Sequence, residues 1–301
     1  MPEHWFVTGS YGQLGRALME RLTHANTPVS GCDIDELDVA EPDAVRKRLA
    51  SLPRPLVWAN AAGFTQVDRC EREPEVAARA NAVAPAVLAE ACAVAGVRLV
   101  HVSTDYVFPG DARRPYREDD PTGPRSVYGR TKLAGECAVL AASDDFLVVR
   151  TSWVFGAGRN FIAAVLDQAA RRRAGTASGP LRVVDDQTGR PTYAVDLADA
   201  IVRLVEAGAR GLVHVANQGV ATWWDLARRA LDGAGYADIE IERIKSSDLV
   251  TDAARPAWSV LDTTRAESLG VKSRSWQDAV TAYLRSDHAP LAVLIEDSAH
   301  A

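Results

Sequence analysis

Lysine is scarce in this sequence, paired cysteines are absent and no apolar run is long. Four lysines leave arginine to supply 30 of the 34 basic residues, so a lysine within a motif is less easily explained by chance. No uninterrupted apolar run approaches the ~18 residues that a membrane span needs, and Met1–His4 lead into a strand-like segment without the basic and apolar regions of a signal peptide. The four cysteines form no CxxC pair, which favours reduced, buried or incidental thiols. These absences predict a cytoplasmic protein with no membrane contact.

Basic charge is also in deficit. The formal net charge of the 301 residues is −6, which disfavours nucleic acid or an anionic membrane as the main partner, because both attract basic surfaces. A phosphorylated small molecule is compatible with this charge, since a few amides and arginines suffice to bind it. With 47% apolar and 25% charged residues, the chain has a globular composition and is long enough for one large domain or two unequal lobes.

The first half of the chain alternates short apolar runs with helical patterns, as βαβ units do. Strands are expected at His4–Thr8, Val29–Asp33, Leu56–Ala59, Leu99–Ser103 and Phe146–Arg150. Helices are expected between them at Gln13–His24, Pro42–Leu52, Pro74–Ala95 and Val127–Ala142. The continuous apolar character of the strands suits a parallel sheet that is covered on both faces.

After about Thr151 the pattern loosens. Helices are expected at Asn160–Arg173, Val195–Ala207, Trp223–Ala234 and Ser275–Leu284, with a strand at Leu181–Val184. We therefore predict an α/β protein with a Rossmann-type doubly wound parallel sheet in residues 1–150, to which some later segments return. A smaller mixed α/β substrate-binding lobe in residues 151–286 would close over the strand ends, where ligands bind in such sheets. Residues 287–301 lack a clear period and are expected to form a flexible tail.

The first expected strand runs directly into three glycines spaced G-x-x-G-x-x-G, and a helix follows. Such a turn lets the backbone approach a pyrophosphate closely, and the helix N-terminus offers free N–H groups to the phosphates. A glycine-rich turn alone has little specificity, but its position between the first strand and the first helix favours a dinucleotide site. The residues expected to bind the cofactor here are Gly9, Ser10, Tyr11, Gly12, Gln13 and Leu14.

The second and third expected strands also end in residues suited to a dinucleotide. Asp33 is placed to bond the hydroxyls of the adenosine ribose. Its charge would repel the additional phosphate of NADPH, and no basic residue stands nearby in the sequence. NADH is slightly favoured on this ground, although the choice between NADPH and NADH stays open. Further cofactor contacts are expected from Asp38 and Val39 against the adenine, and from Asn60, Ala61 and Ala62 along the cofactor backbone.

A tyrosine and a lysine stand four residues apart on the expected helix 127–142. This spacing places Tyr128 and Lys132 on one helical face, about 5–6 Å apart. Reduction of a ketone needs a proton donor, and a nearby ammonium lowers the pKa of a phenol by favouring the phenolate. Tyr128 would be the general acid, while Lys132 would tune it and hold the nicotinamide ribose. Thr104, at the end of the fourth strand, would bond the ketone oxygen.

Several longer motifs accompany this set. They are Ser103–Gly110 (STDYVFPG), Tyr128–Glu136 (YGRTKLAGE), Arg150–Phe155 (RTSWVF), Asp186–Thr192 (DQTGRPT), Thr222–Trp223 and Ala254–Pro256. Through them the chain resembles, from Trp5 to about Leu284, the dTDP-4-dehydrorhamnose reductase family of the extended short-chain dehydrogenase/reductase superfamily. The resemblance implies reduction of the C4 ketone of a dTDP-4-keto-6-deoxyhexose with NADPH or NADH, by a cytoplasmic monomer or homodimer. It implies that Thr104, Tyr128 and Lys132 are catalytic, and that the sugar nucleotide contacts Thr104, Asp105, Val107, Phe108, Trp153, Asn160, Gln187 and Arg255.

Besides the acidic turn Asp33–Glu36, which leaves the choice between NADH and NADPH open, two departures from the family pattern limit the transfer. Arg16 stands where a glutamate helps to bind magnesium at a dimer interface in the family, so we expect no such metal. Trp258 replaces an asparagine after the Arg-Pro pair, which makes a modified deoxysugar a plausible substrate beside dTDP-4-dehydrorhamnose. Asn81 matches a helix asparagine that helps to position the active site in the family, and a plain helix-packing role is the alternative.

Three other functions are weighed against the reductase. A 4,6-dehydratase of the same superfamily would need an acid where Tyr106 stands, which disfavours elimination. An epimerase that retains its NAD is not excluded by any residue. A non-catalytic nucleotide-binding regulatory subunit shares the fold, but the complete set of Thr104, Tyr128 and Lys132 disfavours it.

Overall fold

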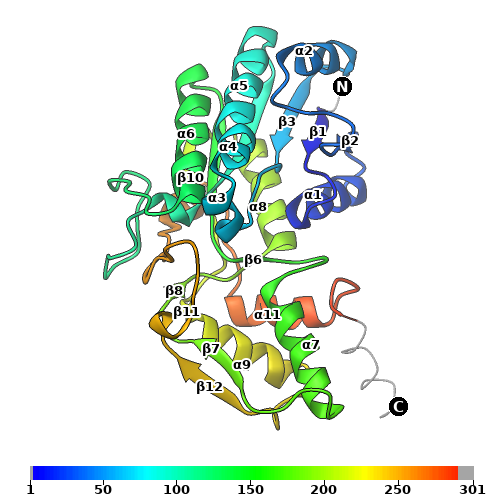
Figure 1. Ribbon diagram of the computed structural model, residues 1–301. Helices are drawn as coiled ribbons and strands as arrows, with labels where there is room; N and C mark the ends of the chain where they lie inside the picture. Colours follow the sequence, from blue (N-terminus) through cyan, green and yellow to red (C-terminus); the bar gives the residue numbers. More distant parts are fainter. Residues whose placement is uncertain (1–2, 291–301) are drawn as a thin grey trace.

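The computed structural model describes residues 3–290, and its centre is a six-stranded sheet in which all neighbouring strands run parallel (Figure 1). The strand order is β10-β5-β4-β3-β1-β2. The strands are β1 (His4–Thr8), β2 (Val29–Cys32), β3 (Leu56–Asn60), β4 (Arg98–Thr104), β5 (Leu147–Thr151) and β10 (Gly211–His214). The predicted α/β class with a doubly wound parallel sheet is confirmed. Strand β10 was not predicted, because four residues that begin with glycine give almost no periodic signal.

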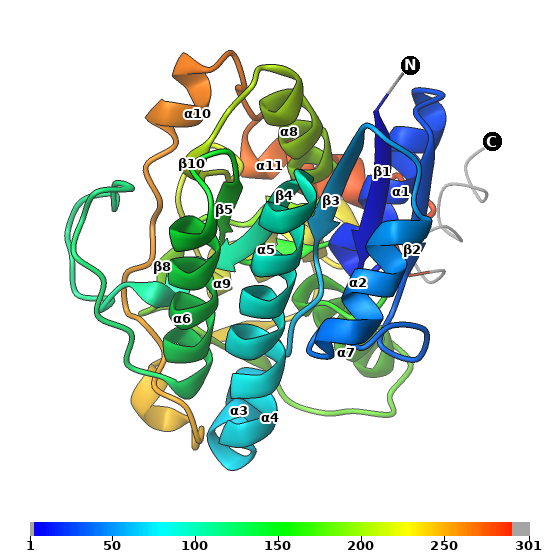
Figure 2. The same ribbon diagram turned by 90° about the horizontal axis from the view of Figure 1, so that it is seen from above.

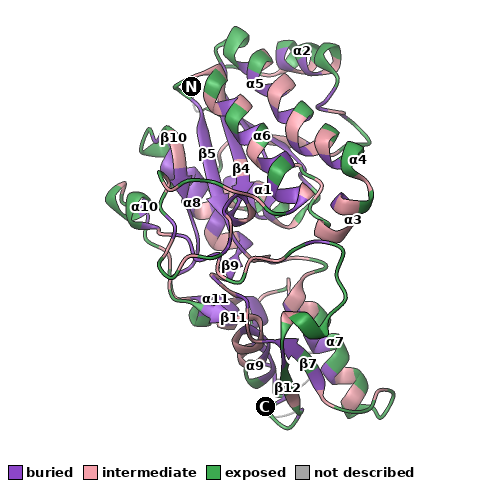
Figure 3. Ribbon diagram, turned by 60° about the vertical axis from the view of Figure 1, so that its left-hand side comes forward, coloured by how far each residue is buried: buried purple, intermediate pink, exposed green. Residues whose placement is uncertain are grey.

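Helices cover both faces of this sheet (Figure 2). One face carries α1 (Gln13–His24) and α8 (Ala194–Glu206), whose leucines share a core with β1 and β5. The other face carries α2 (Pro42–Ser51), α5 (Ala84–Ala95) and α6 (Val127–Ala142). The sheet is buried between these two layers, and the outer helical faces are exposed (Figure 3).

The predicted helix 74–95 is divided. It consists of α4 (Pro74–Ala78), a π-helical turn η1 (Arg79–Val83) and α5, and a short helix α3 (Val67–Arg72) precedes it. The stretch Pro74–Ala95 is the one candidate within residues 3–290 that is long and apolar enough to cross a membrane by length and composition. Its residues Leu88 and Cys92 lie in the core beneath the sheet, and a core helix of a globular protein passes the same test.

A second, smaller lobe lies beyond the carboxyl ends of the strands (Figures 1 and 3). Its core is shared by three helices and a parallel pair of strands: α7 (Phe161–Arg173), α9 (Trp223–Gly233), α11 (Trp276–Leu284), β7 (Leu181–Val184) and β12 (Ile241–Ile244). The remaining elements are short: β6 (Val154–Phe155), β8 (Thr188–Gly189), β9 (Thr192–Tyr193), β11 (Ala221–Thr222), α10 (Thr264–Ser268), η2 (Asp105–Val107) and η3 (Ser246–Asp248).

The predicted flexible tail lies mostly outside the described residues. Within the described part, His288 contacts the Tyr193 hydroxyl at 3.2 Å and Glu20 at 3.3 Å. Residues 287–290 therefore pack against the body of the protein.

Candidate active site

The glycine turn after β1 has the form that an anion site requires. Gly9 has a φ of +75°, and a Cβ atom there would lie 2.7 Å from the Ala62 nitrogen, so only glycine fits. Helix α1 begins at Gln13 with neither a side-chain cap nor an acidic residue in its first turn. The first amides of α1 are therefore available to a phosphate. The positive end of the helix dipole lies at the same place and attracts the negative charge of a phosphate. Gly12, Gln13 and Leu14 line a cavity of about 750 Å³.

The two residues that precede Gly12 in this turn lie beside the cavity rather than along it. Ser10 is buried, and Tyr11 is exposed with its hydroxyl donating to Glu36 at 3.0 Å. The amide of Tyr11 donates to the Asp33 carboxylate at 3.3 Å, and that of Ile34 does so at 2.8 Å. Asp33 thus stands at the edge of the glycine turn, where a ribose hydroxyl could reach its carboxylate.

A basic residue from a later part of the chain pairs with two acidic residues that follow β2. Arg79, from η1, contacts Asp38 and Glu41 at 2.6 Å each. Both contacts of Arg79 are made to these two carboxylates and neither is made to Asp33, so the expectation that no basic residue stands near Asp33 stays a prediction. Asp38 also accepts from the Ala40 amide, and Val39 belongs to the core, so neither is among the residues that line the cavity.

The three residues at the end of β3 have two different roles: one supports the structure and two line the cavity. Asn60 is buried, and its side chain accepts from Thr8 and from the Ala62 amide and contacts His101 at 3.2 Å. Ala61 and Ala62 line the cavity. Asn60 therefore shapes the strand end, while the two small residues leave room beside it.

Asn81 fixes the loop that follows these alanines. It lies fully buried in the π-helical turn, accepts from the Phe64 amide at 2.8 Å and donates to the Phe64 carbonyl at 3.0 Å and to Thr131 at 3.3 Å. The π-helical turn that divides the predicted helix contains Asn81, and such turns often occur at functional sites. Asn81 connects the cavity loop with α6.

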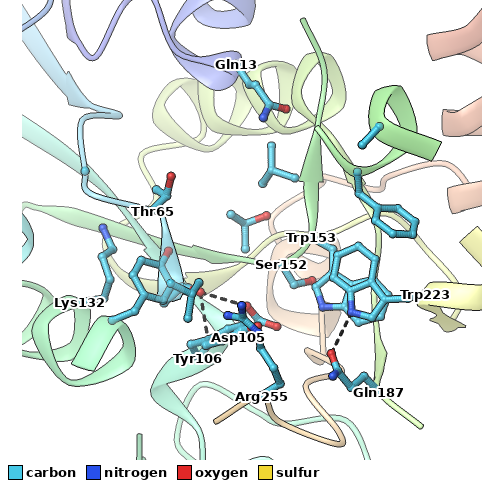
Figure 4. A pocket seen from close by; sticks show the side chains of 18 of the residues that line it. Gln13, Thr65, Asp105, Tyr106, Lys132, Ser152, Trp153, Gln187, Trp223 and Arg255 are labelled. Atoms are coloured by element: carbon cyan, nitrogen blue, oxygen red, sulfur yellow. Dashed lines mark hydrogen bonds between the residues drawn. The ribbon is translucent and has the colours of Figure 1, made fainter. Parts of the chain in front are cut away.

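Thr104, Tyr128 and Lys132 come together in the same cavity as the glycine turn. Thr104 ends β4, and Tyr128 and Lys132 lie on α6, which Ser126 caps by accepting from the Gly129 amide at 3.1 Å. The ammonium of Lys132 donates to the Val102 carbonyl at 2.6 Å. Figure 4 shows Lys132 on one side of the cavity and a pair of tryptophans on the other.

The prediction that Lys132 lowers the pKa of Tyr128 is wrong for the protein chain by itself. Burial raises the pKa of Tyr128 above its ordinary value, and the nearby Thr104 hydroxyl offsets only part of that rise. Burial also lowers the pKa of Lys132, to about 8. Desolvation therefore dominates both groups, because each is enclosed more completely than the helical spacing alone implied.

The opposite wall of the cavity is aromatic and polar. Trp153 stacks on Trp223 with ring centroids 3.7 Å apart, and Gln187 accepts from the Trp223 indole at 3.1 Å and donates to Ser246 at 2.9 Å. Arg255 donates to Asp68 at 2.6 Å. Trp153, Gln187 and Arg255 all line the cavity, as does Asp105.

Three residues expected to contact substrate are not among those that line this cavity. Val107 and Phe108 are buried, and Phe108 stacks on Tyr116 with centroids 4.2 Å apart. Asn160 caps α7 by accepting from the Ala163 amide at 3.0 Å and donates to the Gly156 carbonyl and the Tyr283 hydroxyl. All three are occupied with packing or capping and are not among the residues that line this cavity.

Several cavity residues were not proposed from the sequence. They are Thr65, Val67, Val102, Ser103, Tyr106, Thr151, Ser152, Val154, Phe161, Ala164, Val165, Gln168, Leu181, Arg182, Val183, Val184, Trp223, Leu249 and Thr251. Trp223 could have been found, because its Thr-Trp pair is one of the family motifs. The apolar residues of α7 and β7 carry only a core pattern, so nothing in the sequence separates them from packing residues.

The expected absence of magnesium stays a prediction. Arg16 donates from Nε to the Tyr11 carbonyl at 2.9 Å. Within residues 3–290 no group of three or more His, Cys, Asp or Glu side chains is arranged to hold a metal ion.

Comparison with known proteins gives a consistent result. The family model described as RmlD substrate binding domain matches residues 4–288. The dTDP-4-dehydrorhamnose reductase of Mycolicibacterium smegmatis is 42% identical over 286 residues, covering 93% of this chain and 84% of that protein. A probable dTDP-4,6-dihydroxy-2-methyloxan-3-one 4-ketoreductase of Streptomyces antibioticus is 41% identical over 299 residues, covering 95% and 97%.

Solved structures agree with these relatives. A dTDP-4-dehydrorhamnose reductase from Clostridium acetobutylicum superimposes with a TM-score of 0.87 at 33% identity, covering 93% of this chain and 98% of that one. The dTDP-4-dehydrorhamnose reductase of Bacillus anthracis in complex with NADP does so with a TM-score of 0.86 at 30% identity, covering 94% and 99%.

Proposed function

The chain belongs to the RmlD substrate binding domain family, and on that premise we propose that it reduces the C4 ketone of a dTDP-4-keto-6-deoxyhexose with NADPH or NADH. The observation that carries this proposal is that Thr104, Tyr128 and Lys132 line one cavity together with the glycine turn of α1. A dinucleotide on the turn and a sugar nucleotide in the second lobe would meet at these three side chains.

The cofactor fits the residues present. The phosphate site is supplied by the uncapped start of α1 and by Gly9, where a side chain would not fit. The small residues Ala61 and Ala62 leave room for the cofactor backbone. We propose that residues 1–150 bind the dinucleotide, with α8 and β10 returning to its sheet, and that residues 151–286 hold most of the sugar nucleotide. A bound nicotinamide supplies hydride to the ketone carbon.

The side chains of the protein would supply the proton for the reduction and orient the substrate. Tyr128 keeps its proton at neutral pH because burial raises its pKa, so it can give that proton to the oxygen of the ketone as negative charge develops there. Lys132 lies one helical turn away and would bond the nicotinamide ribose; its positive charge favours the phenolate that remains. Thr104 would orient the carbonyl by donating a hydrogen bond to it.

The walls of the cavity suit a nucleotide sugar. Arg255 offers a guanidinium to a diphosphate, and Trp153, Trp223 and Gln187 present apolar faces and amide atoms to a sugar ring. Asp105 faces the same space. We further propose a cytoplasmic monomer or homodimer that needs neither nucleic acid nor a membrane.

The substrate class leaves two sugars in competition. The relatives named for dTDP-4-dehydrorhamnose and for a modified 4-keto sugar are 42% and 41% identical, so similarity does not separate them. A dehydratase or an epimerase is less well supported: the solved UDP-glucose 4-epimerase and dTDP-glucose 4,6-dehydratase are only 18% and 19% identical and share the fold alone. Tyr106, with a pKa raised to about 12 by burial, could not serve as the carboxylate that elimination needs.

The test is reduction itself. Purified protein is given NADPH or NADH with dTDP-4-dehydrorhamnose or dTDP-4-keto-6-deoxyglucose, absorbance of the cofactor is followed, and the product is identified by NMR. We expect Tyr128→Phe and Lys132→Met each to lose about 100-fold or more in kcat, while Tyr236→Phe, in the core of the second lobe, keeps wild-type activity. Binding of nucleotides without any turnover above the Tyr128→Phe level would instead identify a non-catalytic regulatory subunit.

A further inference from the structure

The single proton of the Thr104 hydroxyl is already used in a hydrogen bond within the protein. The hydroxyl oxygen accepts from the Tyr106 amide at 3.2 Å, and the proton is donated to Asp105 Oδ1 at 3.0 Å. The same hydroxyl lies near enough to the phenol of Tyr128 to lower that group's pKa. A hydroxyl offers one donor and two lone pairs. In this arrangement Thr104 has no proton left for a ketone oxygen.

The carboxyl that takes this proton is itself only partly satisfied. Asp105 is 2% exposed, and its Oδ2 has no hydrogen-bond partner among the described residues. The nearby hydroxyl of Ser259 is also buried without a partner that meets hydrogen-bond geometry. A buried, unpartnered carboxylate oxygen is costly in free energy unless it gains a proton or a ligand. Asp105 also faces the cavity, so its proton would be placed where the chemistry occurs.

We propose, resting on the ketoreductase function given above, that Asp105 is a positioning residue that acts in its protonated form by turning the Thr104 hydroxyl toward the substrate ketone. The protonated acid donates its O–H to Thr104, whose oxygen then accepts from Asp105 and from the Tyr106 amide. The proton of Thr104 is thereby free to point to the ketone oxygen. Loss of the proton from Asp105 reverses this hydrogen bond and withdraws the donor.

The surroundings of Asp105 set the direction of the pH dependence. Burial raises its pKa to about 6, and the hydroxyls of Ser259 and Thr104 limit the rise. The titratable and charged groups around it are Tyr106 on η2, Tyr128 on α6, and the ion pair of Arg255 with Asp68 on α3. Burial keeps both tyrosines protonated at neutral pH. The Thr104 donor is therefore present at low pH and is lost as the pH rises through the pKa of Asp105.

The variant Asp105→Asn distinguishes a positioning role of protonated Asp105 from an ordinary contact between Asp105 and the sugar. Asp105→Asn cannot ionise, has nearly the same shape and can donate an N–H to Thr104. We expect wild-type kcat to fall as the pH rises through the pKa of Asp105 and to level off about tenfold lower, where the ionised carboxylate withholds the Thr104 donor. Asp105→Asn should keep kcat within about threefold of the wild-type low-pH value and lack this decline. Asp105→Ala should lose about tenfold in kcat at every pH, and Thr104→Val should abolish the benefit of Asp105→Asn.

Two kinetic outcomes would overturn the proposal. One is an Asp105→Asn enzyme that retains the wild-type decline with pH. The other is a raised KM for the sugar nucleotide with kcat unchanged, because that result would make Asp105 an ordinary contact to the sugar.

A second measurement does not depend on turnover. In protein labelled with ¹³C at the aspartate carboxyl carbons, the Asp105 signal is identified by its loss in Asp105→Asn and is titrated by NMR. We expect an apparent pKa clearly above that of an ordinary aspartate, and a further rise in Thr104→Val, which removes a donor to the carboxylate. Absence of wild-type turnover would refute the proposed reaction, whereas turnover combined with an ordinary Asp105 titration would refute only the role of Asp105.

Discussion

Trp153 and Trp223 lie face to face, with ring centroids 3.7 Å apart and planes within 5° of parallel. Trp153 reaches this position from a left-handed backbone with a φ of +47°, a conformation that costs about 1–3 kcal/mol in a residue other than glycine. Gly189 lies beneath its ring, where a Cβ atom would come within 2.5 Å of the indole. The stacking on Trp223 and the space left by Gly189 thus hold Trp153 in this strained conformation, on the cavity wall opposite Lys132 (Figure 4).

Removal of the Trp223 ring should reduce the affinity for substrate more than it reduces the stability of the fold. For Trp223→Ala we expect KM for the sugar nucleotide to rise by about tenfold, because an aromatic contact of this kind contributes about 0.5–1.5 kcal/mol beyond its buried area. Steady-state kinetics at saturating cofactor measure the effect. Trp224→Ala is the matched control, since Trp224 packs under Arg243 outside the cavity lining; an equal rise in KM there would show that the wall has no specific role.

Cofactor preference should respond to the carboxylate at the end of β2. Asp33 stands beside the glycine turn and repels a 2′-phosphate, and a single charge at such an exposed position is worth about 1 kcal/mol. Asp33→Asn keeps the amide contacts and should raise the ratio of kcat/KM for NADPH over NADH by about fivefold. Asp35→Asn, which removes the same charge two residues away, should change the ratio less. An unchanged ratio in Asp33→Asn would mean that Asp33 does not face the ribose.

The contrast between β1 and β10 shows how far the sequence predicts this fold. The bounds of β1, α1, α6 and β7 agree with the predicted ranges, because each has a clear apolar period between glycine, proline or capping residues. Strand β10, which completes the sheet, has only four residues, and its identity as a strand depends on pairing with β5. Pairing of distant segments is a tertiary effect that local periodicity does not contain.

The candidate site, like the fold, contains residues that can be predicted from local sequence and residues whose position depends on tertiary contacts. The glycine turn and the Tyr128–Lys132 pair are visible in the sequence because their chemistry depends on local spacing. Asp38 was proposed for the cofactor, yet it binds Arg79 from a helix 41 residues later. Phe108 belongs to a family motif, yet it supports the loop above the sheet by stacking on Tyr116. A motif therefore identifies residues that matter without separating those that touch a ligand from those that hold them.

The buried ion pair between α6 and β5 should be important for stability. Arg150 donates to both carboxylate oxygens of Glu136, one at 2.9 Å, and the two side chains are 3% and 2% exposed. Glu136→Gln leaves the Arg150 charge buried without its counterion, and we expect the free energy of unfolding to fall by about 3 kcal/mol. Urea denaturation measures this loss. Asp167→Asn, which breaks the exposed pair with Arg171, should change stability little, and equal effects of both substitutions would contradict the prediction.

His214 should make the fold sensitive to acid. It lies fully buried against the Tyr116 carbonyl at 3.1 Å and the Arg150 guanidinium at 3.4 Å. Burial, with a smaller contribution from Arg150, lowers its pKa from 6.5 to about 3. Between these two values the unfolded chain binds a proton that the folded protein does not. The free energy of unfolding should therefore fall by about 1.4 kcal/mol per pH unit as the pH drops below 6.5.

The slope identifies the residue responsible. His101, whose pKa burial also lowers, should add a similar contribution, so the wild-type slope exceeds that of one histidine. Replacement of His214 by Gln should remove about 1.4 kcal/mol per pH unit from that slope, even if the variant is less stable at neutral pH. The comparison requires urea unfolding at several pH values between 5 and 6.5, with the exposed His24→Gln as the control. The same slope in His214→Gln and in the wild type would show that His214 accepts its proton without unfolding of the protein.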